Sequence, residues 1–463
     1  NLPIFFPIFA ALKDNALQRS DNQHKFDTFR QQFGTFTFTK QEVKVADGGL
    51  SLAFEFSLDG QYDFRPTLTV PARPFFHWEQ IPFEQLETLA FHIGMIELVS
   101  YWKIACPKRV IVMPFALSEM QKSWWKKLYY NGLGEFFYLN GISCTETDFM
   151  TIETPSQRNF VRVEQPLEEK VVIPVGGGKD SVVSLELLRN AIDAIPLIVN
   201  PRGATLNCVK TAGYADDAII VVNRTLDPVM LQLNKEGFLN GHTPFSAMLA
   251  FVTLLLSVGS GCRYVALSNE SSANESTVPG TNINHQYSKS IEFERDFREY
   301  VAENINTKYQ YFSFLRPLNE MQIAWFFSQF KAYHRVFRSC NAGSKTDSWC
   351  GRCPKCLFTW LILSPFLSRE DLTAIFGKDL MADAALRPIF EELNGMAPVK
   401  PFECVGTVEE VRACADFMSD KIGTIVAESP LGDASVEDIL RRFNTEHFLP
   451  EKFVKLLKSR LHV

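Results

Sequence analysis

Apolar and polar residues alternate along residues 33–71, which is the pattern of β-strands that bury one face. Four segments show this alternation: residues 35–39, 43–45, 50–56 and 67–70. Asp-Gly pairs at 47–48 and 59–60 lie between them and are typical of hairpin turns. The pattern therefore predicts antiparallel strands near the start of the chain.

The rest of the first third mixes helical and extended patterns. We expect a helix over residues 83–102, a short strand at 109–113, a second helix from Ser118 and a strand at 148–153. With the preceding strands, these elements predict an N-terminal α+β domain over residues 1–165 that has no recognisable catalytic motif. The polar run 157–170 is the predicted linker.

The opening run from Leu2 to Leu12 is apolar, but it has no basic start and it contains Pro3 and Pro7. A secretory signal peptide has a positively charged start before its apolar core. We therefore expect a packed arm here and not a signal peptide.

Strands and helices alternate from residue 171 onward. Buried-strand runs lie at 171–175, 196–199, 218–222 and 264–267, and helical runs lie at 181–190 and 244–258. Strands separated by helices predict a parallel sheet that is covered by helices on both faces. We expect this α/β domain to span residues 166–366 and a mostly helical C-terminal region to follow over residues 367–463.

Composition narrows the class of protein. Of the 463 residues, 46% are hydrophobic, and 53 acidic residues against 47 basic residues give a net charge of −6. Proteins that hold long nucleic acids by their phosphates usually carry positive charge, so no nucleic-acid partner is expected. The longest apolar stretch, 244–259, is shorter than the ~20 residues that cross a bilayer. We expect a cytoplasmic protein with no membrane partner.

A glycine-rich loop connects the first strand of the predicted α/β domain to its helix: Gly176, Gly177, Gly178, Lys179, Asp180 and Ser181. Glycines let backbone N–H groups face an anion without obstruction by a Cβ atom, and a helix N-terminus adds partial positive charge. Lys179 can neutralise a phosphate, Ser181 can donate a hydrogen bond to it, and Asp180 can hold Mg²⁺. The loop matches neither the Walker A motif nor the dinucleotide fingerprint. The simpler alternative is a structural strand–helix turn.

Four of the ten cysteines lie close together in sequence: Cys340, Cys350, Cys353 and Cys356. Without a secretory signal, this spacing is typical of a metal site and not of disulfides. Tetrahedral Zn²⁺ in a structural role is the expected occupant, and an iron–sulfur cluster or no metal are the alternatives. The other six are scattered, and several have apolar surroundings that suit a buried thiol: Cys106, Cys144, Cys208, Cys262, Cys404 and Cys414.

Three polar stretches contain residues suited to proton transfer or substrate binding: 240–244 with His242, 268–270 with Asn269 and Glu270, and 284–289 with His285 and Lys289. The second stretch follows a predicted strand, at the edge where open α/β sheets bind ligands. A lone histidine is more often a hydrogen-bonded structural residue than a catalyst, and this alternative stays open. Guanidinium groups fork onto carboxylates and phosphates, so four arginines are candidate ligands: Arg202, Arg295, Arg316 and Arg338.

The glycine-rich loop resembles the S-G-G-x-D-S loop of the PP-loop ATP pyrophosphatases, which cleave ATP between its α- and β-phosphates. Gly176 stands where most of that superfamily has Ser, so one hydroxyl donor is missing. The resemblance implies that Asn200 and Pro201, at the end of the second strand, lie near adenine. The cysteine spacing is similar to that of the zinc knuckle in the PP-loop enzyme that makes the queuosine precursor.

A larger set of motifs narrows the resemblance. In chain order they are G-G-G-K-D-S, L-N-G-H-T-P, S-N-E-S-S-A, N-H-Q-Y-S-K-S-I-E-F-E, Y-F-S-F-L-R-P-L and R-S-C-N…W-C-G-R-C-P-K-C. Together they resemble the UDP-N-acetylmuramoyl-L-alanyl-L-glutamate epimerase family (MurL), over roughly residues 171–366 and more loosely over the front third. The resemblance implies that ATP and UDP-MurNAc-L-Ala-L-Glu yield AMP, diphosphate and UDP-MurNAc-L-Ala-D-Glu for peptidoglycan.

The implied chemistry suits these residues. A Cα proton beside a free carboxylate is hard to remove because negative charge builds on negative charge, whereas adenylation of that carboxylate makes the proton far more acidic. The loop, with Mg²⁺ on Asp180, would serve adenylation. A pair of proton carriers would come from this pool: His242, Glu270, His285 and Lys289. The predicted substrate contacts are Asn269, Arg202 and Arg316.

The family implies a small-molecule UDP-muramoyl-dipeptide substrate and a functional link to a muramoyl ligase that does not depend on D-glutamate.

Two alternative functions remain open on the sequence alone. One is a nucleobase- or tRNA-modifying PP-loop enzyme of the queuosine-precursor type, which the loop and the cysteine spacing support and the net charge disfavours. The other is a non-catalytic protein in which the loop only holds ATP.

Overall fold

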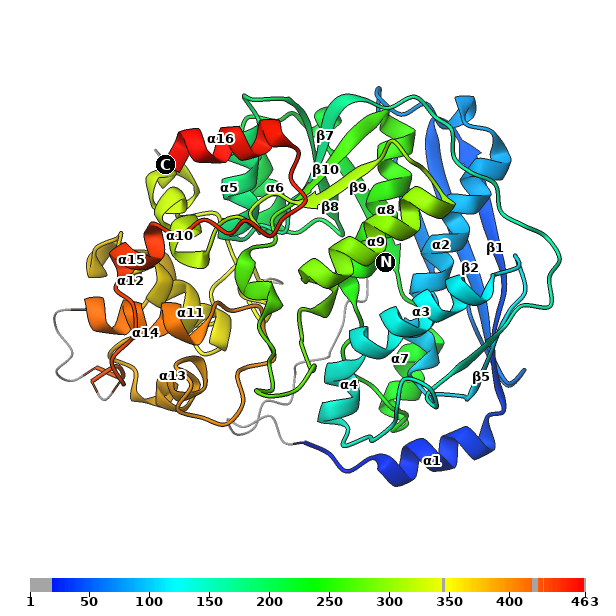
Figure 1. Ribbon diagram of the computed structural model, residues 1–463, viewed down its shortest axis with the longest axis horizontal. Coiled ribbons are helices and arrows are strands. Elements are labelled where there is room, and N and C mark those ends of the chain that lie inside the picture. Colours follow the sequence, from blue (N-terminus) through cyan, green and yellow to red (C-terminus); the bar gives the residue numbers. More distant parts are fainter. Residues whose placement is uncertain (1–18, 344–345, 419–423, 428, 462–463) are drawn as a thin grey trace.

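The computed structural model describes residues 19–343, 346–418, 424–427 and 429–461, so the expected arm from Leu2 to Leu12 lies outside the described residues. The described strands are β1 (Thr35–Ala46), β2 (Gly49–Leu58), β3 (Tyr62–Phe64), β4 (Thr67–Val70), β5 (Arg109–Val112), β6 (Thr151–Glu153), β7 (Glu168–Pro174), β8 (Asp193–Val199), β9 (Ile220–Thr225), β10 (Cys262–Leu267) and β11 (Gln310–Ser313). They form one sheet in the order β11-β10-β7-β8-β9-β4-β2-β1-β5-β6, and β3 pairs with β2 (Figure 1).

The N-terminal strands differ from the predicted pattern in two respects, one of which is the additional short strand β3. The segments 35–39 and 43–45 belong to a single strand, β1, and not to two strands. The register of β1 against β2 shifts between Phe38 and Lys40. Such an irregularity locally disrupts the ladder without ending the strand. The break in apolar alternation therefore marks a register shift inside one strand.

Four helices accompany these strands: α1 (Gln23–Gln32), α2 (Phe83–Trp102), α3 (Glu119–Gly132) and α4 (Gly134–Leu139). The bounds of α2 match the predicted helix, and α2 packs against β1. The second predicted helix, α3, begins after Ser118, whose hydroxyl accepts a hydrogen bond from the backbone N–H of Gln121 at 3.3 Å. This capping arrangement satisfies a backbone donor that the helix cannot pair itself.

The strands β7 to β11 are parallel where they pair with one another, as predicted. The helices in this part are α5 (Lys179–Leu188), α6 (Gly203–Thr211), α7 (Pro228–Lys235), α8 (Phe245–Ser260) and α9 (Ile291–Asn304). Val172 of β7 belongs to the core that includes α2 and α8, whereas Val171 and Ile173 belong to the core that includes α5. Opposite faces of one strand thus enter two cores, and the predicted mixed α/β architecture is confirmed.

Antiparallel pairing of β4 with β9 joins the N-terminal strands to the parallel strands. Thr67 pairs with Thr225 in this ladder, and their hydroxyl oxygens lie 2.6 Å apart. The sequence does not predict this junction because neither strand carries a signal for its partner. The division at residues 165 and 366 into three domains stays a prediction.

The regular elements of the described residues after 366 are helices. With α10 (Glu320–Gln329) and α11 (Pro354–Leu363) they form the helical group opposite β1 and β2 in Figure 1: α12 (Arg369–Phe376), α13 (Arg387–Leu393), α14 (Val408–Phe417), α15 (Val436–Leu440) and α16 (Glu451–Leu461). The ring of Phe453 on α16 lies 5.0 Å from that of Phe312 on β11. The end of the chain therefore packs back onto the sheet. Among the described residues, no helix combines the length and apolar character needed to cross a membrane.

Candidate active site

The glycine-rich loop occupies the turn between β7 and α5, as the sequence predicts. Gly177 has φ +83°, and a Cβ atom at this position would lie 3.0 Å from the backbone of Ala204 and Thr205 in α6. Its carbonyl accepts a hydrogen bond from the N–H of Arg338 at 2.8 Å. Both the backbone conformation and the close approach of α6 require glycine at this position.

The buried ammonium group of Lys179 forms ion pairs with Asp180 and with Glu320, the first residue of α10. Burial lowers the pKa of Lys179, but the two carboxylates outweigh this effect and the net shift is upward. Burial acts to raise the pKa of Glu320, and the ammonium group of Lys179 opposes this shift. The Ser181 hydroxyl donates to the Gly178 carbonyl at 2.9 Å. The loop thus collects one cation and two carboxylates at the start of α5.

Asn200 follows β8 and holds β9 in place. Its amide nitrogen donates to the carbonyl of Arg224 at 3.1 Å, and its side-chain oxygen accepts from the backbone N–H of Arg224 at 2.8 Å. The guanidinium of Arg224 in turn pairs with the buried carboxylate of Glu97 at 2.6 Å. Pro201 and the exposed Arg202 follow, and α6 begins directly after them. The adenine contacts of Asn200 and Pro201 and the substrate contact of Arg202 stay predictions.

A second group of titratable residues brings two of the predicted polar stretches together. Glu135, on α4, forms an ion pair with the Nδ1 atom of His285 and lies 3.5 Å from the Nδ1 atom of His242. The two imidazole rings are 4.7 Å apart between centroids. Both histidines therefore share one carboxylate, which comes from a helix that carries no motif in the sequence.

The two histidines have opposite protonation tendencies. Burial lowers the pKa of His242 to about 4 and is only partly opposed by Glu135. Burial also acts to lower the pKa of His285, but its interactions with Cys404 and Glu135 outweigh this and raise it to about 10. At neutral pH, His242 is therefore neutral and His285 is charged. Neighbouring titratable groups whose pKa values are shifted in opposite directions are common in acid–base sites.

Cys404 extends the group toward the glycine-rich loop. The Nζ atom of Lys289 lies 3.0 Å from the Sγ atom of Cys404. Burial acts to raise the pKa of this thiol, but Lys289, Lys355 and His285 outweigh it and lower the pKa to about 6. Burial lowers the pKa of Lys289, whereas Cys404, Glu270 and Asp180 raise it, and the net shift is upward. Lys289 therefore interacts with both the thiol and the loop residue Asp180.

Arg316 fixes the segments that carry Glu270 and Lys289. Its fully buried guanidinium donates to the carbonyl of Glu270 at 2.6 Å, to the carbonyl of Lys289 and to the hydroxyl of Ser313 at 3.2 Å. Asn269 donates to the same hydroxyl at 3.0 Å. The Glu270 carboxylate is buried and accepts from Ser272 at 3.0 Å. In this structure Arg316 and Asn269 hold backbone and hydroxyl groups, and their predicted substrate contacts stay predictions.

The four clustered cysteines converge on one point. Sulfur–sulfur distances are 3.7 Å for Cys340 and Cys353, 3.7 Å for Cys350 and Cys356, and 3.5 Å for Cys353 and Cys356. A tetrahedral ion with Zn–S bonds of about 2.3 Å separates its sulfurs by roughly 3.8 Å. An iron–sulfur cluster binds its thiolates to different irons and spreads them farther apart. The backbone N–H of Gly343 also donates to the sulfur of Cys340 at 3.2 Å. The donor set fits a single tetrahedral metal ion.

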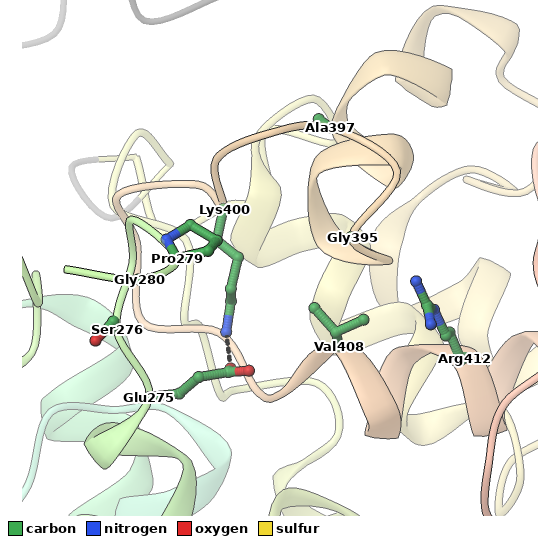
Figure 2. Close-up of a pocket in the computed structure, with 9 residues that line it drawn as sticks. All are labelled: Glu275, Ser276, Pro279, Gly280, Gly395, Ala397, Lys400, Val408 and Arg412. Atoms are coloured by element: carbon green, nitrogen blue, oxygen red, sulfur yellow. Dashed lines mark hydrogen bonds and ion pairs between the residues drawn. The ribbon is translucent and has the colours of Figure 1, made fainter.

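A cavity of about 420 Å³ lies between the loop 275–280 and the segment 395–412 (Figure 2). Figure 2 shows Lys400 pointing toward Glu275, with which it forms an ion pair. None of the predicted site residues lines this cavity. Its two walls nevertheless belong to the stretches of chain that lead to His285 and Cys404.

Sequence reasoning missed three residues of this region. Glu320 and Glu135 are isolated carboxylates on helices, and nothing in the local sequence distinguishes them from surface residues. In the sequence Cys404 is one of six scattered cysteines, of which several have apolar surroundings, but its contact with Lys289 shows a polar environment. Only the spatial arrangement could identify these three.

The fold and these groups define a mixed α/β protein with a glycine-rich strand–helix loop, a four-cysteine cluster and a partly buried acid–base cluster. The family model described as "MurL N-terminal domain" matches residues 27–314, and the model described as "MurL C-terminal domain" matches residues 335–429. The chain belongs to the MurL family.

Three relatives carry the name UDP-N-acetyl-alpha-D-muramoyl-L-alanyl-L-glutamate epimerase. The protein from Micromonospora sp. is 35% identical over 405 residues, which is 84% of this chain and 88% of the relative. The protein from Salinispora tropica is 35% identical over 409 residues, or 85% of this chain and 86% of the relative. The protein from Xanthomonas oryzae pv. oryzae is 31% identical over 401 residues, or 85% and 87%.

Proposed function

We propose that this protein is an epimerase that converts the terminal L-Glu of UDP-MurNAc-L-Ala-L-Glu to D-Glu. The observation that carries the proposal is the similarity to epimerases of this name over more than four-fifths of the chain. The two family matches also include both sides of the acid–base cluster. Glu135, His242 and His285 lie in the first matched region, and Cys404 lies in the second.

We further propose that the reaction consumes ATP and that the α/β part of the chain is a PP-loop ATP pyrophosphatase domain. The conformation of Gly177 and the position of Lys179 at the start of α5 support a phosphate site. ATP would adenylate the α-carboxylate of the terminal glutamate, which is bonded to the carbon that is inverted. Bound Mg²⁺ would neutralise phosphate charge, and Asp180 and Glu320 are the carboxylates available to hold it.

Inversion needs one group to remove the Cα proton and another to return a proton on the opposite face. The cluster contains a charged His285, a neutral His242 and a buried Glu270 in one region, so it offers both donors and acceptors. The partial burial of the histidines and of Glu135 would limit the access of water to the carbanion. These contacts support proton transfer near the loop and leave the identity of the two carriers to experiment.

The proposal is tested by incubating the protein with Mg-ATP and UDP-MurNAc-L-Ala-L-Glu and measuring AMP, diphosphate and D-glutamate after acid hydrolysis. UDP-MurNAc-L-Ala, which lacks the glutamate, is the matched control. We expect AMP and D-glutamate with the dipeptide substrate and neither with the control. Release of AMP with a nucleobase or tRNA substrate, and none with the muramoyl dipeptide, would overturn the proposal in favour of an RNA-modifying enzyme.

We also propose that the cysteine cluster binds one structural Zn²⁺, because its sulfur spacing fits a single tetrahedral ion.

The product of the proposed reaction would be used by cell-wall ligases. A ligase that joins L-glutamate to UDP-MurNAc-L-Ala is the expected functional partner. That link is tested by combining the two enzymes with L-glutamate as the only glutamate source. Accumulation of UDP-MurNAc-L-Ala-L-Glu would contradict it.

A further inference from the structure

Cys404 differs from the other cysteines outside the metal cluster. Burial raises the pKa of the remaining five thiols: Cys106, Cys144, Cys208, Cys262 and Cys414. Cys404 instead lies in the segment before α14, with its sulfur 3.0 Å from the ammonium nitrogen of Lys289. A thiol in contact with an ammonium group is in its reactive, anionic form more often than a free thiol.

Charged groups from several elements face this sulfur. Lys289 reaches it from the short helix η4 (Tyr287–Lys289), Lys355 from the start of α11, and His285 from the loop before η4. Glu403 lies 3.3 Å from Lys355, and Glu135 pairs with His285. Each of these two cations therefore has a carboxylate partner of its own. Within the described part of the chain Lys289 forms no ion pair with a carboxylate, and Glu270 and Asp180 act on its charge from farther away. A thiolate on Cys404, 3.0 Å from the ammonium nitrogen, is therefore the anion in direct contact with it.

We infer that Cys404 is one of the two groups that carry a proton to and from the glutamate Cα. This inference rests on the proposed epimerase function and specifies a residue for it. The sulfur takes the Cα proton, so the Cα–H bond breaks, an S–H bond forms and the electron pair moves into the activated carboxyl group. A second group returns a proton to the opposite face, and the Cys404 proton then leaves to solvent.

Geometry separates the roles of the neighbouring residues. His285 interacts with Cys404, and its Nδ1 atom forms an ion pair with Glu135. Both His285 and Lys289 are therefore positioning residues that keep the sulfur anionic. A base with a pKa close to the working pH combines a large reactive population with a strong driving force, which suits Cys404 to this step.

The test uses the full-length protein with UDP-MurNAc-L-Ala-L-Glu and Mg-ATP in D₂O. Cys404→Ala and Cys404→Ser are compared with wild type and with Cys144→Ser, a half-buried thiol whose pKa is raised to about 11. We expect both Cys404 variants to lose about 10²–10⁴-fold in deuterium incorporation at Cα and in D-glutamate formation. The ratio of AMP released to D-glutamate formed should rise, and Cys144→Ser should match wild type.

A pH profile separates proton transfer from a structural role. The rate of inversion by wild type should fall on the acid side with a midpoint near pH 6, where the sulfur becomes protonated. Lys289→Met should move that midpoint upward by a unit or more. Iodoacetamide labelling of Cys404 should show the same midpoint and the same displacement.

The outcomes are distinguishable. If wild type forms no D-glutamate, the proposed function fails and this inference fails with it. If wild type inverts glutamate and Cys404→Ala labels Cα within threefold of wild type, the inference alone fails. A Cys404 variant that loses AMP release and labelling in equal proportion, with an unchanged melting temperature, would assign the residue to adenylation and would also overturn the inference.

Discussion

The ammonium group of Lys179 is held between Asp180, its neighbour in sequence, and Glu320, which lies 141 residues further along the chain. This arrangement places a buried negative charge at the point where a phosphate is expected. A cation is therefore needed in the site whether or not nucleotide is present. Lys179 supplies it in this structure.

Lys179→Met should destabilise the fold by about 3 kcal/mol, because removing one partner of a buried ion pair leaves the other unpaired. The loss should shrink as the pH falls, because protonation neutralises Glu320. The double variant Lys179→Met, Glu320→Gln should recover most of it. Chemical denaturation at pH 5 and pH 8 provides the measurement. The control is Lys170→Met, which removes an exposed pair with Glu168 and should cost less than about 1 kcal/mol.

Gly177→Ala should damage the loop far more than Gly176→Ala. Gly177 has φ +83°, and a Cβ atom added to it would lie 3.0 Å from the backbone of α6. A Cβ atom added to Gly176 would meet nothing within 4 Å. We expect Gly177→Ala to lower the melting temperature and weaken ATP binding at least tenfold, measured by calorimetry. Equal ATP affinity of the two variants would show that the backbone of the loop does not contact the nucleotide.

Asp180→Asn should abolish substrate-dependent diphosphate release while the protein remains folded. The side chain is about one-third exposed and its carboxylate contacts Lys179, so its charge acts at the site and contributes little to packing. Asp193→Asn, a change at an exposed carboxylate on β8, should release diphosphate at the wild-type rate. Near-normal turnover by Asp180→Asn would exclude this carboxylate as a metal ligand.

Metal analysis of the purified protein should find about one zinc per chain. Cys353→Ser should lower the melting temperature and the yield of soluble protein more than it lowers the activity per folded molecule, because a closed four-sulfur site acts through folding. Cys262→Ser, which changes a buried thiol outside the cluster, should retain the zinc. An iron–sulfur absorption band in fresh protein would contradict the assignment.

His92 should make the fold sensitive to acid. It is fully buried, its Nδ1 atom lies 2.7 Å from the carbonyl of Thr88, and burial lowers its pKa to about 4. An unfolded histidine binds a proton near pH 6.5, so below that pH the unfolded state holds more protons and stability falls. The loss should approach about 3 kcal/mol near pH 4.

His92→Gln should flatten this part of the pH dependence, measured by denaturant unfolding between pH 4 and pH 7. His24→Gln, at an exposed position, should leave the profile as it is in wild type. An unchanged slope in His92→Gln would mean that another group controls acid unfolding. His242, whose pKa is also lowered to about 4, would then be the next candidate.

The sequence predicted elements that are determined locally. The apolar run 171–175 and the helical run 181–190 fall on β7 and α5, because a buried strand and a helix start have strong signals within a few residues. The four cysteines were recognised by spacing alone. By contrast, the pairing of β4 with β9 depends on edges that meet only after both parts fold, and no local pattern records it.

The same distinction applies to the candidate site. His242 and His285 stood out because they lie in polar stretches between apolar elements. Glu135 and Cys404 did not, since each is an ordinary residue type whose role comes from what lies opposite it. Long-range contact, and not residue type, separates Cys404 from the thiols that only pack.

While the ribosome is still making the chain, β4 has a partner on one side only. Its second partner includes Thr225, which is 158 residues after Thr67. At about 5–20 residues per second, synthesis of that interval takes roughly 10 to 30 seconds. During this time the free edge of β4 presents unpaired backbone groups that can capture a strand from another nascent chain. If the chain were cleaved at the predicted linker, β4 would keep an unpaired edge in the N-terminal fragment. In the C-terminal fragment, β9 would lack its partner β4.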